Sequence, residues 1–342
     1  MTNSRVAPRT TSSHTTAFAE ALEQVNVQPL WDRYQNMLTP EPQAPDAPML
    51  WSWNTMLPMI ERAVQEVPME DAERRVLLLS NPAFAPNSYT TTNLQAGLQI
   101  LEPNETAPPH RHTVGALRFV IEGHDATTWV NGKPCPMSTG DLILTPSWCW
   151  HEHRNESQHR VIWLDGLDVP LVHGFSTAAL QFGEVRDIPE QYSETLSQAG
   201  MLPTNIPKQY QHYSPRYHYA ADSVAKALQQ SPAQADGSQL LRYSNPVTGG
   251  PVMPTLDCYA LALRKHAQTR AWRSTSNSVA VVVNGSGQSS IGNTTISWQK
   301  NDVFSLPHWH WVSHKAETDA QLFLMSDHAL LEAAGYLLVQ TE

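Results

Sequence analysis

Two short histidine strings could hold a metal ion. They are HRH at 110–112 and HEH at 151–153. Residues two apart on a β-strand point to the same face, so His110 and His112 can reach one ion, and His151 can complete the set from a neighbouring strand. Neutral imidazoles suit Zn, Cu, Fe and Ni. The alternative, favoured for an isolated HxH string, is a pair of buried histidines that are hydrogen-bonded without metal.

The residues around these strings predict a β domain. From Tyr89 onward, short β-rich runs alternate with Pro, Gly or Asn-Gly turns, and Asn131-Gly132 is typical of a tight hairpin. Many short strands at this spacing predict an antiparallel sandwich or barrel rather than βαβ units. Earlier in the chain, apolar residues follow helical spacing, which predicts a partly helical N-terminal region.

The same β pattern returns from Thr255. NDVFSLPHWHWVSH at 301–314 runs parallel to GDLILTPSWCWHEH at 140–153, so the chain is predicted to be internally duplicated. The three candidate ligands align with Trp272, Ser274 and Val312. The second copy is therefore expected to be free of metal. Its alternating histidines lack an HxH partner and are expected to serve packing or a subunit interface; they are His308, His310 and His314.

These patterns predict a mainly β chain with five segments. They are a mobile arm over 1–15, an N-terminal helical region over 16–87, a metal-binding β domain over 88–175, a connector over 176–250, and a metal-free β domain over 251–342. The last segment is expected to end in an apolar helix, LLEAAGYLLV.

The composition excludes several classes of protein. Apolar residues make up 41% and charged residues 16% of the 342 residues, which argues against disorder and coiled coil. A net charge of −10 argues against nucleic acid or an anionic membrane as partner. Three cysteines without CxxC spacing favour a reducing cytoplasm. No signal peptide or membrane-spanning apolar run is visible, so a cytoplasmic location is expected.

The histidine strings also belong to a longer pattern. It reads His110-x-His112, Glu122-Gly123, Gly140-x5-Pro146-x4-His151-x3-Asn155. This pattern resembles the two signature motifs of the cupin superfamily, whose fold is a small β-barrel that binds a metal. The glutamate ligand of the first motif is replaced by Ala116 or Leu117, and the glycine of the second motif by Trp148. The resemblance implies a bicupin, with two antiparallel jelly-roll barrels and a three-histidine site without a carboxylate.

Longer strings narrow the resemblance. HRHT-x3-LRFV-x-EG, GD-x3-TP-x-W-x-WH-x-H, VIWLDGLD and ERRVLLLSNP resemble gentisate 1,2-dioxygenases and their salicylate and 1-hydroxy-2-naphthoate relatives, from about Leu30 to the C-terminal helix. The resemblance implies Fe(II), with three open coordination positions for a small aromatic carboxylate and O2. Cleavage of gentisate between its carboxyl- and hydroxyl-bearing carbons would give maleylpyruvate. It also implies a homotetramer.

Six further residues are expected near the metal or in the substrate pocket. Arg118, six residues beyond His112, is placed on the same strand face by even spacing and is expected to bind the substrate carboxylate. A surface arginine is the alternative, but the run ALRFVIEG is otherwise apolar. His153 either hydrogen-bonds substrate or oxygen, or is a satisfied core histidine. Asp165 is expected to orient a histidine, with a plain turn residue as the alternative.

The resemblance also suggests that Gln99 lines the substrate pocket. Arg74 is expected to reach the substrate carboxylate or an interface, although an arginine in an N-terminal helix is more often solvated. Gln95 lies at a possible pocket-lining position and is expected to influence the choice of substrate.

Three other functions remain open at this point. Cleavage of salicylate or a substituted salicylate is the neighbouring alternative, because it needs the same ligands. A non-catalytic ligand-binding bicupin is more distant, since it would not require three convergent histidines and Arg118. A Zn or Mn isomerase is disfavoured, because such cupins generally retain the carboxylate ligand that is missing here.

Overall fold

A computed structural model describes residues 16–183 and 192–342, so the predicted arm over 1–15 lies outside the described residues. The chain divides into two compact units, 1–43 and 44–342. The described part of the short unit contains helix α1 (Thr16–Gln24), the 3-10 turn η1 (Leu30–Asp32) and helix α2 (Tyr34–Met37). Every described strand lies in the long unit.

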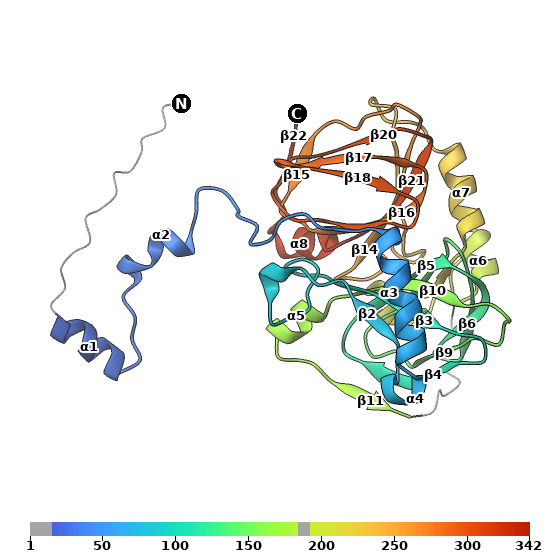
Figure 1. Cartoon of the computed structure of the whole chain (residues 1–342), viewed down its shortest axis with the longest axis horizontal. Coiled ribbons are helices and arrows are strands. Elements are labelled where there is room, and N and C mark those ends of the chain that lie inside the picture. Colours follow the sequence, from blue (N-terminus) through green and yellow to red (C-terminus); the bar gives the residue numbers. More distant parts are fainter. Residues whose placement is uncertain (1–15, 184–191) are drawn as a thin grey trace. The chain divides into compact units, whose positions relative to one another are not determined.

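The long unit contains two β sandwiches, each made of a six-stranded and a five-stranded antiparallel sheet (Figure 1). The six-stranded sheet of the first sandwich has the order β12 (His218–Tyr219), β8 (Leu142–Thr145), β5 (Ala116–Glu122), β10 (Val161–Leu167), β3 (Gln95–Leu101), β2 (Val76–Leu78). Its five-stranded sheet has the order β11 (Leu180–Phe182), β4 (Thr106–His112), β9 (His151–Arg154), β6 (His124–Val130), β7 (Lys133–Ser138).

The second sandwich repeats this order strand for strand. Its six-stranded sheet runs β1 (Leu50–Trp51), β19 (Val303–Leu306), β16 (Ser278–Asn284), β21 (Ala320–Ser326), β14 (Asp257–Leu263), β13 (Gln239–Arg242). Its five-stranded sheet runs β22 (Val339–Thr341), β15 (Trp272–Ser274), β20 (Val312–Ala316), β17 (Ser286–Ile291), β18 (Thr294–Gln299). The predicted duplication and the mainly β, antiparallel architecture are confirmed.

Helices are short and lie between the strands. In the first half of the long unit they are α3 (Trp53–Glu66), α4 (Met69–Ala72), the 3-10 turn η2 (Pro82–Phe84) and α5 (Val169–Gly174). In the second half they are α6 (Glu194–Gln198), the 3-10 turn η3 (Lys208–Gln211), α7 (Ala221–Gln230) and α8 (His328–Ala334). None of the helices described over 16–183 and 192–342 is long and apolar enough to cross a membrane.

Two local predictions can be compared with the backbone. The hairpin between β6 and β7 is confirmed, with Asn131 and Gly132 both at positive φ (50° and 82°). The C-terminal helix is shorter than predicted. It ends at Ala334 because Gly335 adopts a left-handed conformation (φ 74°), and Val339 begins a strand instead.

Each sandwich takes an edge strand from the segment that precedes the other. β1 comes before the first sandwich in the chain but pairs with β19 of the second, whereas β12 comes before the second but pairs with β8 of the first. The matching aspartates accept hydrogen bonds from the helices that follow these strands. Asp302 Oδ1 accepts from Trp53 N (2.7 Å), and Asp141 Oδ1 accepts from Ala221 N (2.8 Å). The two sandwiches are therefore interlocked.

Three hydrophobic cores hold the long unit together. One lies inside each sandwich, and the largest lies between the two six-stranded sheets. At its centre, Phe119 of β5 stacks on Phe323 of β21 with ring centroids 4.2 Å apart. Burial of each such aromatic ring contributes on the order of 2–3 kcal/mol. This core fixes one face of β5 and β10, so their other faces point into the first sandwich.

Candidate active site

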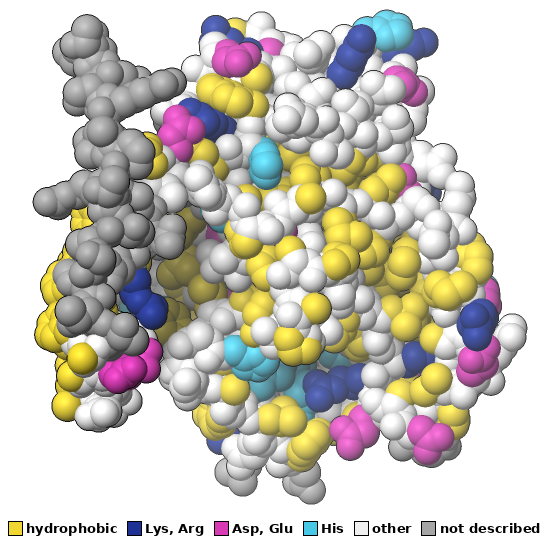
Figure 2. Space-filling view, turned by 60° about the vertical axis from the view of Figure 1, so that its left-hand side comes forward, with side chains coloured by type: hydrophobic (Ala, Val, Ile, Leu, Met, Phe, Trp, Pro, Cys, Tyr) yellow, Lys and Arg dark blue, Asp and Glu magenta, His cyan; other side chains and the backbone are white. Residues whose placement is uncertain are grey.

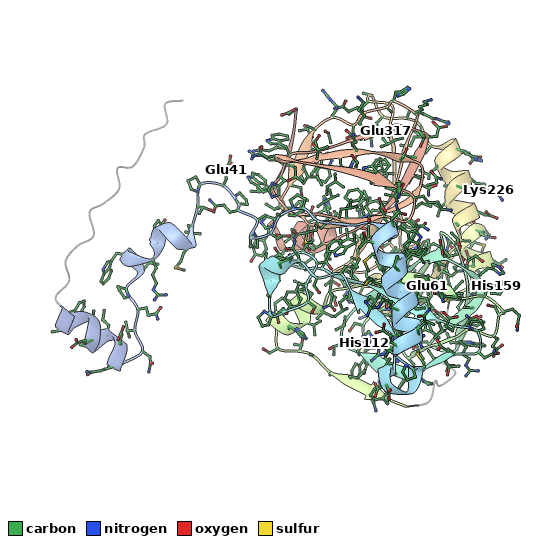
Figure 3. All side chains as sticks on the ribbon, in the orientation of Figure 1. Glu41, Glu61, His112, His159, Lys226 and Glu317 are labelled. Atoms are coloured by element: carbon green, nitrogen blue, oxygen red, sulfur yellow. The ribbon has the colours of Figure 1, made fainter. Side chains whose placement is uncertain are left out.

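The three predicted ligands converge inside the first sandwich. His110 and His112 lie on β4, and His151 lies on β9 directly opposite His110. One ligand atom from each of the three lies within 4.8 Å of the others, and among the described residues this is the one group of its kind. His112 is labelled in Figure 3, and Figure 2 shows histidine side chains beside basic ones on one face of the molecule.

Backbone carbonyls fix the orientation of all three imidazoles. The Nδ1 atoms of His110, His112 and His151 lie 2.8, 2.7 and 3.0 Å from the carbonyl oxygens of Pro108, Val114 and Cys149. A carbonyl only accepts, so each Nδ1 carries the proton and each Nε2 keeps its lone pair. His151 Nε2 is buried and has no hydrogen-bond partner. These features fit a bound divalent metal.

The three imidazoles are held in the neutral form that a metal requires. Burial lowers the pKa of His110 to about 3 and the pKa of His112 to about 4. Burial also lowers the pKa of His151 well below its usual value, and the charge of Arg118 acts in the same direction. Their lone pairs are therefore available at neutral pH.

The strand that carries HRH is clamped from its other face. The Arg111 guanidinium lies between the rings of Trp148 and Trp150, 4.5 and 4.7 Å from their centroids. It also donates to Gln181 Oε1 of β11 (2.9 and 2.7 Å). Trp148 has φ of 63°, an unusual value for a bulky residue, and its N–H donates to His112 O (2.7 Å).

A buried ion pair faces the histidines from the six-stranded sheet. Arg118 of β5 lies opposite Asp165 of β10, with Nε 3.5 Å from Oδ1. Arg118 Nη1 donates to Thr145 Oγ1, and Asp165 Oδ1 accepts from Trp163 Nε1 (2.9 Å). Burial lowers the pKa of Arg118 to about 10, so the guanidinium keeps its charge at neutral pH. Burial raises the pKa of Asp165, and Arg118 opposes that rise.

The structure corrects two expectations about this pair. Arg118 does not share a strand with His112, because a turn over 113–115 separates β4 from β5 and Arg118 approaches from the other sheet. Even spacing from His112 therefore could not predict the direction of the Arg118 side chain, because the spacing was counted across a turn. Asp165 contacts Arg118 and Trp163 rather than a histidine. The backbone carbonyls take the orienting role expected of Asp165.

Two predicted residues present buried polar atoms without hydrogen-bond partners. The Nδ1 atom of His153 lies 2.8 Å from Thr128 Oγ1, but its Nε2 has no partner. Gln99 Nε2 is likewise buried and without a partner. An unpaired buried polar group costs about 1–3 kcal/mol, so such groups require an explanation. His153 is thus satisfied at one nitrogen only.

Arg74 lies closer to the metal site than a solvated helix residue would. It follows α4 and precedes β2, and its Nη1 lies 2.8 Å from His110 Nε2. Gln95 instead uses its amide to donate to Ser88 O (2.9 Å). Thr128 and Thr145 were missed by the sequence reasoning. Comparison of the two repeats could have flagged Thr145, since a buried leucine, Leu306, stands at its position in the second repeat.

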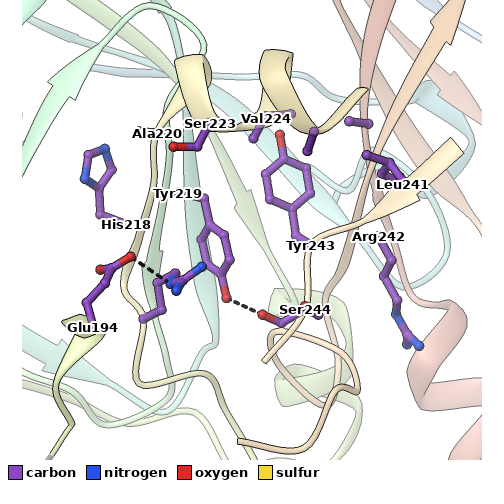
Figure 4. Close-up of a pocket in the computed structure, with 13 residues that line it drawn as sticks. Glu194, His218, Tyr219, Ala220, Ser223, Val224, Leu241, Arg242, Tyr243 and Ser244 are labelled. Carbon is purple, nitrogen blue, oxygen red and sulfur yellow. Dashed lines mark hydrogen bonds and ion pairs between the residues drawn. The ribbon is translucent and has the colours of Figure 1, made fainter. Parts of the chain in front are cut away.

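A separate hollow of about 270 Å³ lies beside α7 (Figure 4). Two of its charged groups, Arg216 and Glu194, form an ion pair (3.2 Å). Tyr219 donates to Ser244 O across its floor (2.7 Å). It contains none of the converging histidines, so the first sandwich remains the candidate for chemistry.

Comparisons with known proteins agree with this location. Residues 97–167 match the family described as a cupin domain. The chain is 36% identical to gentisate 1,2 dioxygenase 1 of Aquipseudomonas alcaligenes over 93% of this chain and 94% of that protein. It is 32% identical to 5-aminosalicylate 1,2-dioxygenase of a Comamonas species, over 96% and 91%. Salicylate 1,2-dioxygenase of Pseudoaminobacter salicylatoxidans, solved as adducts with gentisate, has a TM-score of 0.88 at 33% identity, covering 100% of this chain and 97% of that one.

Proposed function

The chain belongs to the gentisate 1,2-dioxygenase family of ring-cleaving cupin dioxygenases, and from this membership we propose that it opens the ring of gentisate to give maleylpyruvate. One observation carries the proposal. Three histidines, each with Nδ1 held by a backbone carbonyl, bring one ligand atom each within 4.8 Å of the others, and the charge of the buried Arg118 acts on all three. Relatives named for gentisate match at 36%, 35% and 34% identity, which favours gentisate as the substrate.

We propose Fe(II) as the metal and His110, His112 and His151 as its ligands. When bound, Fe(II) would supply open coordination positions that bring the substrate and O2 together, with the substrate as the source of the electrons that reduce O2. The uncharged imidazoles leave the full charge of the ion in place, because no carboxylate joins them. A substrate anion is therefore attracted to the site by both the ion and the neighbouring arginine.

The surrounding side chains bind and orient the substrate. Arg118 presents a charged guanidinium that is fixed by Thr145 and Asp165, so it can hold a carboxylate without first being ordered. Arg74 is the second cation, and its contact with His110 Nε2 must open when that nitrogen binds metal. The unpartnered nitrogens of His153 and Gln99 can hydrogen-bond substrate oxygens.

The experiment is a paired assay of oxygen uptake. The metal-free protein is loaded anaerobically with Fe(II), then given gentisate and O2, and the ring-opened product is followed by ultraviolet absorbance. Stoichiometric oxygen uptake with gentisate is expected. Oxygen uptake with salicylate and none with gentisate would instead identify a salicylate 1,2-dioxygenase. Loading with Zn(II) is the control, because zinc cannot change its oxidation state.

We also propose a cytoplasmic homotetramer. The three cysteines are buried and unpaired, as expected in a reducing compartment. Several large apolar side chains are exposed close together after both α5 and α8, including Phe175 and Tyr336, each 71% exposed, and contiguous exposed apolar side chains mark protein contact sites. Light scattering of the purified protein measures the mass directly.

A further inference from the structure

The second sandwich contains a cavity of about 530 Å³ where the first has its histidine site. The repeat alignment and strand registers give the counterparts. Five residues that line the cavity stand at the positions of Gln99, His110, His112, His153 and Asp165. They are Leu261, Trp272, Ser274, His314 and Leu324. The second interior thus contains an open cavity at these positions and has none of the three converging histidines.

The walls of this cavity are mostly apolar and partly aromatic. Trp272 and Tyr259 face it together with Leu261 and Leu324. At one end, Leu240 and Val339 are 43% and 52% exposed, so the cavity opens to solvent there. A volume of this size is within the range of small-molecule sites, which are typically apolar with a few polar groups.

One polar group inside the cavity has a defined orientation. His314 Nδ1 lies 2.7 Å from Ser289 Oγ, which accepts a hydrogen bond from Trp298 Nε1 (2.8 Å). Because Ser289 is fully buried, its hydroxyl proton needs an acceptor, and His314 Nδ1 is the acceptor within reach. His314 then carries its own proton on Nε2. That nitrogen can donate a hydrogen bond to a ligand oxygen.

The charged groups around the cavity balance each other. Arg270 and Asp236 both line it and have opposite charges. Asp236 already accepts from Ser238 N (2.9 Å), Ser238 Oγ (2.6 Å) and Arg270 N (3.0 Å). The lining therefore has no excess charge that would select an ion.

From these features, we propose that the second sandwich binds a neutral planar aromatic molecule of one or two rings with a hydroxyl group. The ring lies against Trp272 and Leu324, and the hydroxyl oxygen accepts from His314 Nε2. This site is separate from the proposed catalytic site and does not depend on the reaction assigned to the first sandwich.

The test uses 2-naphthol as the probe and calorimetry on the full-length, metal-free protein. Ser274→Leu fills the cavity, and His112→Leu is the matched change at the same position of the first sandwich. We expect one equivalent of 2-naphthol to bind to the unaltered protein and to His112→Leu, with Kd values that agree within a factor of two. Ser274→Leu is expected to weaken binding at least tenfold. Loss of binding in His112→Leu alone, or no saturable binding, would overturn the proposal.

Two further measurements keep the proposal testable if Ser274→Leu misfolds. A crystal structure with 2-naphthol should place the ring beside Trp272, and a ring located in the first sandwich alone contradicts the assignment. Binding of 2-naphthoate is expected to be at least tenfold weaker than that of 2-naphthol. Equal or tighter binding of the anion contradicts the neutral class of ligand.

Discussion

The first and second sandwiches share one strand order, yet their interiors differ at nearly every position that could do chemistry. The three converging histidines of the first sandwich are replaced by Trp272, Ser274 and Val312. The ion pair of Arg118 and Asp165 is replaced by Ala280 and Leu324, which are also directly opposite each other. The fold therefore does not need these groups. Burying charged and polar groups costs folding free energy, so their presence in the first sandwich indicates a function.

Other features are present in both sandwiches and so belong to the fold. Arg273 lies between the rings of Trp309 and Trp311 (4.5 and 5.0 Å), as Arg111 does between its own tryptophans. Trp309 also has positive φ (59°), like Trp148. The arginine of HRH is thus a clamp for the strand, and only the two histidines beside it are specific to the first sandwich.

The largest expected difference between the sandwiches is metal binding. His112→Ala should reduce iron content to below a tenth and abolish turnover, because it removes one of three ligands. His310→Ala in the second sandwich should leave iron content unchanged. Iron content is measured by elemental analysis of protein loaded anaerobically with Fe(II). Loss of iron from both variants would contradict a single metal site in the first sandwich.

Arg118→Ala should raise the KM for the substrate about 100-fold with iron content unchanged, because the carboxylate loses its charged partner. It should also lower the free energy of unfolding by about 3 kcal/mol, since Asp165 is left buried and unpaired. Steady-state kinetics and urea denaturation measure the two effects.

The matched control introduces the residue types of Ala280 and Leu324, the counterparts in the second sandwich, at positions 118 and 165. Arg118→Ala with Asp165→Leu should regain most of the lost stability but not the KM. If the double variant recovered both, Arg118 would have a purely structural role.

One histidine is retained in both interiors, as His153 in the first sandwich and His314 in the second. Burial lowers the pKa of His314 from 6.5 to about 4. Between these values the unfolded chain binds a proton that the folded protein does not, so the free energy of unfolding falls as pH drops from about 6.5 towards 4. The full loss is on the order of 3 kcal/mol. His314→Gln should reduce this slope in urea titrations without abolishing it, because burial also lowers the pKa of His110 and His112. His266→Gln, at an exposed position, is the control variant. An unchanged slope in His314→Gln would contradict the prediction.

The smallest effects should come from Asp302 and Asp141, which accept hydrogen bonds from the first residues of α3 and α7. Asp141→Ala and Asp302→Ala each remove a hydrogen bond to the first residue of a helix, α7 or α3, and a second one to the N–H of Ser138 or Gln299, and each should cost about 1–2 kcal/mol. Thermal unfolding measures both. Asp141→Ala is expected to lose slightly more, because Asp141 Oδ2 also lies 3.0 Å from His218 Nε2. A loss confined to one variant would show that one edge strand matters more than the other.

Much of this molecule follows from local sequence patterns. The spacing of HRH and HEH identified the converging histidines because alternation along a strand is a local property. The duplication was visible because turns and the aspartates Asp141 and Asp302 recur at matching places. The hairpin at Asn131-Gly132 was predictable because few residues adopt positive φ at two successive positions.

Other features depend on contacts between distant parts of the chain. No sequence pattern showed that β1 would pair with the second sandwich and β12 with the first, since two-residue strands have almost no signal of their own. Arg118 reaches the histidines from the opposite sheet, and its partner Asp165 is distant in the sequence, so only the register of β5 against β10 joins them.

The sequence by itself determined the three converging histidines, the family and the repeat, because these depend on residue type and short-range spacing. Only the tertiary structure decided which atoms the side chains use. The carbonyls that fix the three Nδ1 atoms, the unpaired nitrogens of His153 and Gln99, and the open cavity beside Trp272 arise from packing across two sheets. Such packing depends on strand pairing over long separations, which a linear pattern does not specify.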